Sequence, residues 1–190
     1  MSNVFFTSDL HFFHKNVIKY CNRPWTFEEQ TEELISRWNS RVGLFDEVYH
    51  LGDFAFAGKN KLTEVVEIIK RLNGRITFLK GNHCDSRLWR LIEDSRLSHV
   101  EDIRDYKEIR VNGVKIVMCH YPFETWNTAH HGAWHLHGHT HGSLPSKGKR
   151  LDVGIDNHPE HQVFSYDEVR EYMNNQEFVV VDHHKEETNG

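Results

Sequence analysis

Short polar clusters at five places in the sequence carry side chain types that bind transition metals. The clearest is Gly138-His139-Thr140-His141, which follows the expected strand 134–137. Residues two apart on an extended backbone point to the same side, so His139 and His141 aim two imidazoles at one spot. Imidazole is the commonest protein metal ligand, and the chain carries 16 histidines in 190 residues. The pair alone is a weak signal, because a chain so rich in histidine produces such pairs by chance.

Four further clusters lie upstream, and each follows a stretch with the character of a β-strand. In chain order they are Asp9-Leu10-His11, Gly52-Asp53, Gly81-Asn82-His83 and His120. Carboxylates, imidazoles and amide oxygens bind divalent Mn, Fe, Zn, Ni or Co. So many ligands exceed one four-coordinate site and suit two ions about 3.5–4 Å apart, with an open edge for substrate. Each residue taken alone would be a turn former or a surface residue, so the ordered set carries the metal hypothesis.

The elements that must position these clusters alternate through the first half of the chain. Strands are expected at 3–8, 47–51 and 75–80, with helices at 26–41 and 62–72 between them. This alternation predicts right-handed crossovers and a largely parallel sheet. Such sheets bind ligands beyond the carboxyl ends of their strands, where three of the clusters fall.

The second half of the chain predicts a different arrangement. Asn112-Gly113, between 106–111 and 114–119, is a strong hairpin signal, so we expect this half to be more antiparallel. Ser165 and Glu168 form a capping box for a last helix that ends near Asn174. The other expected elements are a short helix at 85–93 and strands at 134–137, 150–155, 162–164 and 178–181.

The composition is that of a soluble globular protein, with 38% hydrophobic residues and a net charge of −5. We expect a single domain over 1–182 and a disordered polar tail at 183–190. Three widely spaced cysteines, no signal-peptide pattern and no apolar run near 20 residues predict a cytoplasmic protein without a membrane partner. The charge balance argues against a general nucleic-acid binder.

The order Asp-x-His, Gly-Asp, Gly-Asn-His, His and Gly-His-x-His resembles the pattern of the calcineurin-like metallophosphoesterases and spans residues 4–141. The chain looks most similar to small bacterial and phage-type members. The resemblance implies an α/β (α+β) fold, a four-layer αββα sandwich of two mixed β-sheets flanked by helices. It also implies that one metal is held by Asp9, His11, Asp53 and His141, and the other by Asp53, Asn82, His120 and His139, with Asp53 bridging. His83 then faces the substrate, and His83 and Asp53 are the expected catalytic residues.

The charge of such a centre also favours an anionic substrate, independently of the resemblance. Two divalent cations bring four positive charges, whereas Asp9, Asp53 and a bridging hydroxide bring about three negative ones. A remaining charge of about +1 suits a phosphate ester although the chain itself carries −5. We expect metal-bound hydroxide to attack phosphorus while protonated His83 stabilises or protonates the leaving oxygen. Because metal binding needs neutral imidazoles, activity should fall below about pH 6.

One block departs from the phosphoprotein phosphatases of the same superfamily, which continue it as Gly-Asp-x-x-Asp-Arg-Gly. Here Phe56 replaces the second Asp, which orients the catalytic histidine, and Ala57 replaces the Arg that binds phosphate. The sequence therefore argues against a protein phosphatase and leaves open what orients His83. The following Cys84 is interpreted as a bystander, because metal-assisted attack needs no thiolate.

Residues after the first cluster could replace the missing arginine. His14, Asn16 and Arg23 are candidate substrate contacts, and a surface ion pair is the alternative for Arg23. The 152–156 run could supply carboxylates that orient metal-binding histidines, but for Asp156 a simple turn is the preferred interpretation.

The leading hypothesis is a dinuclear-metal phosphodiesterase that acts on a small phosphate ester, with nucleotides among the candidate substrates. A phosphomonoesterase or nucleotide pyrophosphatase with the same mechanism is the nearest alternative. A non-catalytic metal-bound scaffold is disfavoured because His83 and every expected ligand are present. A nuclease is disfavoured because the chain lacks an extended basic face. The sequence does not predict the oligomeric state.

Overall fold

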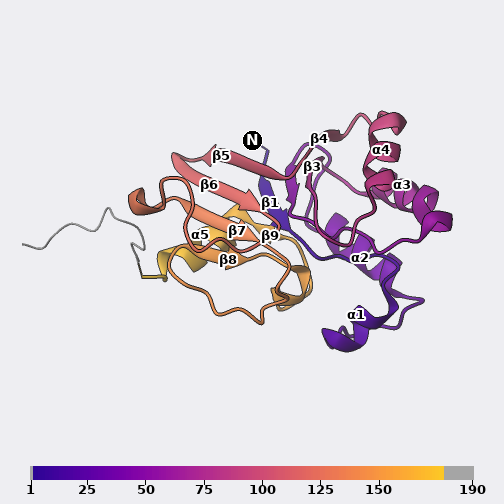
Figure 1. Ribbon diagram of the computed structural model, residues 1–190, viewed down its shortest axis with the longest axis horizontal. Helices are drawn as coiled ribbons and strands as arrows, with labels where there is room; N and C mark the ends of the chain where they lie inside the picture. Colours follow the sequence, from indigo (N-terminus) through magenta and orange to yellow (C-terminus); the bar gives the residue numbers. More distant parts are fainter. Residues whose placement is uncertain (1, 178–190) are drawn as a thin grey trace, which may run out of the picture.

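Two β-sheets form the centre of the protein in the computed structural model, which describes residues 2–177 (Figure 1). The first sheet has the strand order β4-β3-β2-β1-β9 and the second the order β5-β6-β7-β8. The strands are β1 (Val4–Thr7), β2 (Glu47–His50), β3 (Arg75–Leu79), β4 (Val100–Arg104), β5 (Tyr106–Val111), β6 (Val114–Cys119), β7 (Trp134–His137), β8 (Arg150–Asp152) and β9 (Phe164–Ser165). The α-helices are α1 (Lys15–Tyr20), α2 (Gln30–Asn39), α3 (Leu62–Arg71), α4 (Ser86–Ser95) and α5 (Tyr166–Asn174). Short 3-10 helices are η1 (Lys59–Lys61), η2 (Ala129–His131) and η3 (Ile155–Asn157).

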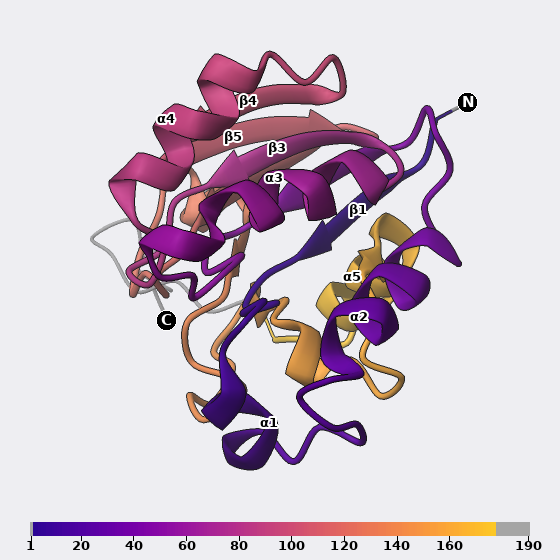
Figure 2. The same ribbon diagram turned by 90° about the vertical axis from the view of Figure 1, so that its right-hand side faces the viewer.

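The first sheet confirms the predicted alternation of strands and helices. Strands β1 to β4 pair in parallel, and β9 joins β1 in the antiparallel direction. Helices α2, α3 and α4 follow β1, β2 and β3, and Figure 2 shows α3 and α4 in front of β3 and β4. Their apolar stripes, which include Trp38, Val65 and Leu88, form one buried cluster with Val48 and Phe78 of the sheet. The carboxyl ends of β1, β2 and β3 therefore lie along one edge.

The second sheet differs from its prediction. The β5–β6 hairpin is antiparallel as expected, but β6 pairs with β7 and β7 with β8 in parallel. The expectation of a more antiparallel second half therefore holds for β5–β6 and for β9 but not for β7 and β8, because the segment 120–133 crosses over and does not form a hairpin. As a result the ends of β6 and β7 face the same edge, which brings His120 and Gly138 together.

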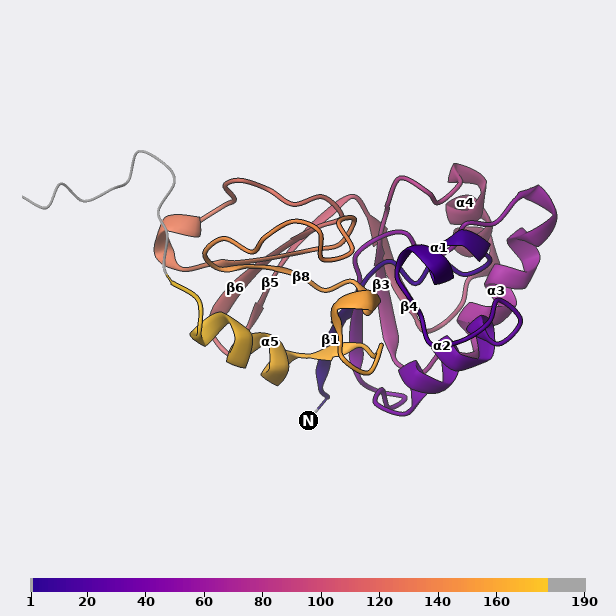
Figure 3. The ribbon, with the colours of Figure 1, turned by 90° about the horizontal axis from the view of Figure 1, so that it is seen from below.

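Side chains from both sheets and α5 form a second buried cluster, which joins the layers. Phe6 and Leu79 come from the first sheet, Met118 and Leu136 from the second, and Met173 from α5. Figure 3 shows the second sheet, the first sheet and helices α2 to α4 in that order across the molecule. The predicted fold of two mixed sheets flanked by helices is thereby confirmed.

The outer face of the second sheet is covered by an irregular segment instead of a long helix. The ring of Phe123 stacks on His135 with 4.8 Å between centroids, and the backbone amide of Phe123 donates to His135 Nε2 at 3.0 Å. Trp126 packs on the same imidazole. This segment also carries the chain from His120 to β7 and so helps to place two of the predicted clusters.

Several element boundaries differ from the predictions. Helix α1 and strand β4 were not predicted, α2 begins later than expected, and β8 ends at Asp152 before the turn η3. The capping box of Ser165 and Glu168 is confirmed at the start of α5. The expected strand at 178–181 and the expected tail lie outside the described residues. Within residues 2–177, none of the helices has the length and apolar composition that crossing a membrane requires.

Candidate metal centre

The turns that follow β1, β2, β3, β6 and β7 bring all five predicted clusters to one place. Backbone hydrogen bonds tie these turns together: the amide of Asp9 donates to Gly52, that of His11 to Asp53, and that of Gly138 to His120, each at 3.0 Å. The amides of His83 and His139 donate to the carboxylates of Asp53 and Asp9, so all five turns are linked by hydrogen bonds.

Asp9, His11 and His141 form the first group of converging side chains. His11 Nε2 lies 3.3 Å from His141 Nε2 and 3.6 Å from Asp9 Oδ1. The other Asp9 oxygen accepts from the Ser8 hydroxyl at 2.5 Å and from the His139 amide at 2.9 Å. Asp9 Oδ1 is buried without a hydrogen-bond partner among the described residues. A buried, unpaired carboxylate oxygen is costly, and a cation between it and the two imidazole nitrogens would satisfy it.

Asp53, His120 and His139 form the second group. His120 Nε2 lies 3.4 Å from Asp53 Oδ2 and 3.1 Å from the Asn82 side-chain oxygen, so Asn82 faces the same spot. Asp53 Oδ2 is also 3.8 Å from His11 Nε2 of the first group. Asp53 thus lies between the two groups, in the position that the resemblance gave to a bridging ligand.

The hydrogen bonds of the histidines leave the inward-facing nitrogens free to bind a metal. His120 donates from Nδ1 to the Leu51 carbonyl at 2.8 Å, and His141 donates from Nδ1 to Asp156 at the same distance. In each ring Nε2 is therefore the atom that faces the site and would bind a metal once it is deprotonated. Burial lowers the pKa of His11 to about 2, so this imidazole is neutral, whereas hydrogen bonds with Asp156 and Cys21 raise the pKa of His141 to about 10, so a metal must displace its proton.

The pKa values of the carboxylates of Asp9 and Asp53 are shifted in opposite directions. Burial raises the pKa of Asp9 to about 6, and nearby His141 and His120 offset this only in part. Burial also acts to raise the pKa of Asp53, but the interaction with His120 and the amide of His83 outweigh it and hold the pKa at about 2. A divalent cation would favour the ionised form of both groups. With its carboxylate, imidazole and amide donors, the site therefore fits divalent metals.

Backbone strain marks the same residues. Asp9, His11, Asp53, His139 and His141 all have φ between 46° and 70°, the left-handed region that side-chain-bearing residues seldom adopt. Such conformations cost of order 1 kcal/mol each and persist where the surroundings enforce them, which is common at functional sites. Asp and His are among the side-chain-bearing residues that adopt this region most often, but the strain was not predicted from the sequence.

Two glycines let the turns approach closely. A Cβ on Gly138 would lie 2.1 Å from Ser8 Oγ and 2.4 Å from Asp9 Oδ2, and one on Gly81 would lie 2.1 Å from Asp53 Oδ1. The glycines in the Gly-His-x-His and Gly-Asn-His blocks are thus needed because the carboxylates occupy the space that a side chain would fill.

Asp156 corrects one sequence interpretation. It does lie in the turn η3, but its carboxylate also binds His141 Nδ1, so it orients this histidine as well as forming a turn. Arg23 corrects a second one. Its guanidinium is fully buried and donates to Asp156 and to the carbonyls of Asp9 and Leu10. It therefore holds the residues that carry the site in place and does not face a substrate.

A cleft of about 580 Å³ opens beside the first group of ligand-type residues. Helix α1 and the residues that flank it form one wall, and the turn after β7 forms the other. Its lining residues include His14, Tyr20, Cys21, His83, Thr140 and Ser143. Of the candidate substrate contacts, His14 lines the cleft, whereas Asn16 is exposed on α1 and does not line it. Tyr20 and Cys21 were not singled out from the sequence, because nothing in their spacing relates them to the metal motifs.

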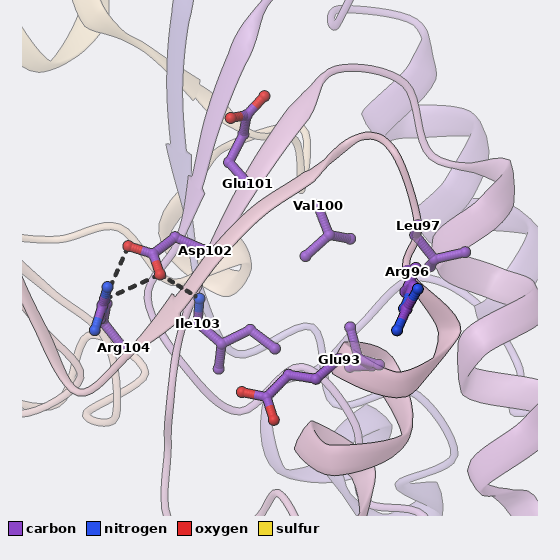
Figure 4. A pocket seen from close by; sticks show the side chains of 9 residues that line it. Glu93, Arg96, Leu97, Val100, Glu101, Asp102, Ile103 and Arg104 are labelled. Atoms are coloured by element: carbon purple, nitrogen blue, oxygen red, sulfur yellow. Dashed lines mark hydrogen bonds and ion pairs between the residues drawn. The ribbon is translucent and has the colours of Figure 1, made fainter.

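A second hollow, of about 330 Å³, lies between α4 and β4 (Figure 4). Its labelled residues include Arg96, Val100 and Ile103, and none of the predicted ligands lines it.

A third group of ligand-type atoms, Cys21 Sγ, His141 Nδ1 and the Asp156 carboxylate, also converges, but Arg23 already pairs with both oxygens of Asp156. The two groups joined by Asp53 are therefore the best candidate centre.

A family model described as the calcineurin-like phosphoesterase superfamily domain matches residues 3–153, which contain all five clusters. The chain belongs to this superfamily. An uncharacterized protein of Methanocaldococcus jannaschii is 35% identical to this phosphoesterase over 164 residues, covering 82% of the chain and 83% of the relative. The Gene 66 protein of Mycobacterium phage D29 is 30% identical over 199 residues, covering 92% and 97%.

Solved structures share the fold of this calcineurin-like phosphoesterase. A protein of unknown function from Aquifex aeolicus has a TM-score of 0.68 and 23% identity, covering 90% of this chain and 100% of that one. A novel archaeal phosphodiesterase has a TM-score of 0.50 and 19% identity, covering 80% and 82%. YfcE, a phosphoesterase from E. coli, has a TM-score of 0.50 and 16% identity, covering 80% and 78%.

Proposed function

We propose that this calcineurin-like phosphoesterase is a two-metal phosphodiesterase that hydrolyses a small phosphate diester. The observation that carries the proposal is the position of Asp53 Oδ2, which lies 3.8 Å from His11 Nε2 and 3.4 Å from His120 Nε2. One carboxylate oxygen that serves two groups of ligands is what a pair of neighbouring ions requires.

The proposed ligands divide into two sets that share Asp53. One ion would be held by Asp9, His11, Asp53 and His141, and the other by Asp53, Asn82, His120 and His139. The donor atoms suit Mn, Fe, Zn, Ni or Co. When bound, such a pair would activate water for in-line attack on phosphorus and neutralise the phosphate oxygens.

The chain's own residues would supply the rest of the chemistry. His83 lines the cleft, and its backbone amide donates to Asp53 Oδ1 at 2.8 Å, so its imidazole is held near the centre. We assign to this imidazole the transfer of a proton to the leaving oxygen. His14 lines the same cleft and is the proposed substrate contact.

Charge favours a diester over a monoester. The proposed centre keeps about one positive charge, which matches the single negative charge of a diester. Arg23 is enclosed and cannot replace the phosphate-binding arginine that Ala57 displaces. The fold is shared with an archaeal phosphodiesterase and with a phosphoesterase, which is compatible with either substrate class.

Hydrolysis of two model esters tests this proposal. With Mn²⁺ present, we expect bis(4-nitrophenyl) phosphate to be cleaved faster than 4-nitrophenyl phosphate, and a chelator to abolish both activities. Asp53→Asn should lower the rate at least 100-fold and reduce bound metal from two ions per chain, measured by elemental analysis. Faster cleavage of the monoester would favour the phosphomonoesterase alternative. Two bound ions with no cleavage of any ester, nucleotides included, would favour a scaffold.

We further infer a reducing, cytoplasmic setting. Cys21, Cys84 and Cys119 are all free thiols. Burial raises the pKa of the Cys84 thiol to about 12, so it stays protonated and is a poor nucleophile. Fractionation of cells that produce the chain, with an antibody against it, would test the location.

A further inference from the structure

The ring of His83 has no hydrogen bond in the part of the chain that the structure describes, although its backbone amide binds Asp53. What surrounds it instead are three other rings in edge-to-face geometry. The centroid of His83 lies 5.4 Å from His11 at 65°, 5.5 Å from Phe56 at 77° and 6.3 Å from His14 at 75°. Edge-to-face ring contacts are directional, so together they can define the orientation of an imidazole.

Phe56 is held in this group through its backbone. Its backbone amide donates to Phe12 at 2.8 Å, and the adjacent residue Ala55 forms a parallel bridge with Phe12. The ring itself is 49% exposed, which is unusual for Phe and is explained neither by the core nor by the metal groups. Its ring centroid lies 4.7 Å from that of His14 and 5.5 Å from that of His83.

The His14 ring that Phe56 contacts is held by a hydrogen bond of its own. The Nδ1 atom of His14 accepts from the amide of Val17 at 2.9 Å and thereby caps α1. The imidazole of His14 also meets that of His11 at 5.4 Å. Phe56 and His14 therefore form two sides of a corner into which the His83 ring fits.

From these contacts we propose that Phe56, supported by His14, is the positioning residue of His83 and takes the role that a carboxylate plays in the phosphoprotein phosphatases. The inference rests on the proposed function, because it assumes that His83 gives a proton to the leaving oxygen. A ring holds the imidazole by shape and quadrupole without adding a negative charge beside a centre that must attract phosphate.

Leaving-group dependence tests the proposal. Methyl phenyl phosphate and methyl 4-nitrophenyl phosphate differ only in the basicity of the leaving phenolate, and the more basic one needs the proton more. We expect Phe56→Leu to lower kcat about tenfold more for the phenyl ester than for the nitrophenyl ester, with little change in KM. Phe56→Tyr keeps the ring and should restore the rate to within about twofold. Equal losses on both esters would overturn the proposal.

A double-mutant cycle separates positioning from a general structural effect. In the His83→Ala background, Phe56→Leu should change neither rate by more than about twofold, because the residue through which it acts is gone. A full additional loss would overturn the assignment. Phe45→Leu removes a ring that is 81% exposed and outside the cleft, and should leave both esters unaffected.

Side-chain NMR of the metal-free protein decides the matter even if no ester is cleaved. With His83 assigned by comparison with His83→Ala, its three-bond couplings should report one rotamer in the unsubstituted chain and averaging in Phe56→Leu. Identical couplings in both proteins would overturn the positioning role. Absence of hydrolysis together with a changed rotamer would instead count against the proposed function alone.

Discussion

At the residue scale, Asp156 supports the proposed centre without facing a metal. Its Oδ2 accepts from His141 Nδ1 at 2.8 Å, and Arg23 holds the carboxylate in place. Burial would lower the pKa of His141, but its hydrogen bonds with Asp156 and Cys21 raise it to about 10. The carboxylate thus fixes the orientation of the ring, which leaves Nε2 facing Asp9 and His11.

Asp156→Asn should therefore weaken Mn²⁺ binding by 10- to 100-fold, the usual effect of losing a carboxylate that orients a metal-binding histidine. Isothermal titration with Mn²⁺ measures this. Asp85→Asn is the matched control, because Asp85 caps α4 and pairs with Arg87 at the surface. An unchanged affinity in Asp156→Asn would show that His141 does not depend on this carboxylate.

Gly138 makes a second residue-scale prediction. A Cβ there would overlap Ser8 Oγ and Asp9 Oδ2, both fixed by hydrogen bonds. We expect Gly138→Ala to destabilise the fold by more than about 2 kcal/mol in urea unfolding and to reduce bound metal, because Asp9 must move. A Cβ on Gly58 would meet nothing within 4 Å, so Gly58→Ala should stay within about 0.5 kcal/mol. Equal effects at the two positions would contradict this interpretation.

At the scale of elements, the ionised side chain of Glu168 holds α5 in place, and its ionisation depends on pH. Glu168 completes the capping box with Ser165 and pairs with Arg41 at 2.8 Å. This pair connects the first turn of α5 to the residues after α2. Burial acts to raise the pKa of Glu168, but Arg41 and Ser165 outweigh it and lower the pKa to about 2. The ionised form is thus favoured in the folded protein.

Glu168→Gln keeps a capping side chain and removes the charge, so it should cost about 1 kcal/mol of unfolding free energy at pH 7. A lowered folded pKa gives stability that is complete above the unfolded value of 4.5 and is lost as the pH falls toward 2. The difference between the two proteins in urea unfolding should accordingly shrink over that window. Glu64→Gln, in an exposed pair with Lys61, should change stability by less than about 0.5 kcal/mol at either pH. A difference that is constant from pH 7 to pH 3 would contradict the charge effect.

Periodicity predicted the elements whose packing is local, and missed those that depend on distant partners. The apolar stripes of α2, α3 and α5 and the hairpin β5–β6 are visible in the sequence. Strand β4 was missed because its side chains are only partly buried and lack a clear alternation. The parallel placement of β7 depends on how 120–133 crosses the sheet, which no local pattern records.

The candidate site shows the same division. The residue types and order of the five clusters predicted side chains that do converge, because the strands that carry them, from both sheets, end at the same edge of the molecule. Asp156, Phe56 and the enclosed position of Arg23 were not predictable in this way. Their roles depend on contacts between loops separated by up to 133 residues, as in the pair of Arg23 with Asp156.

At the scale of the whole molecule, the candidate centre spans the junction of the two sheets. Asp9, Asp53 and Asn82 follow strands of the first sheet, whereas His120 and His139 follow strands of the second. Ions bound between them would therefore link both halves of the fold. Because such a site does not exist in the unfolded chain, the free energy of metal binding adds to the stability of the fold.

Thermal unfolding measures this coupling. Mn²⁺ at about 100 times its dissociation constant should add about 2.7 kcal/mol for each bound ion, which for a chain of this size corresponds to a rise in Tm of about 5–10 °C per ion over the chelated protein. His120→Gln should lose about half of this rise, because it breaks one of the two sets of ligands. His131→Gln, which alters an exposed histidine of η2, should keep it. A Tm that does not respond to Mn²⁺, or that responds equally in both variants, would mean that the two sheets are not joined by metal at this edge.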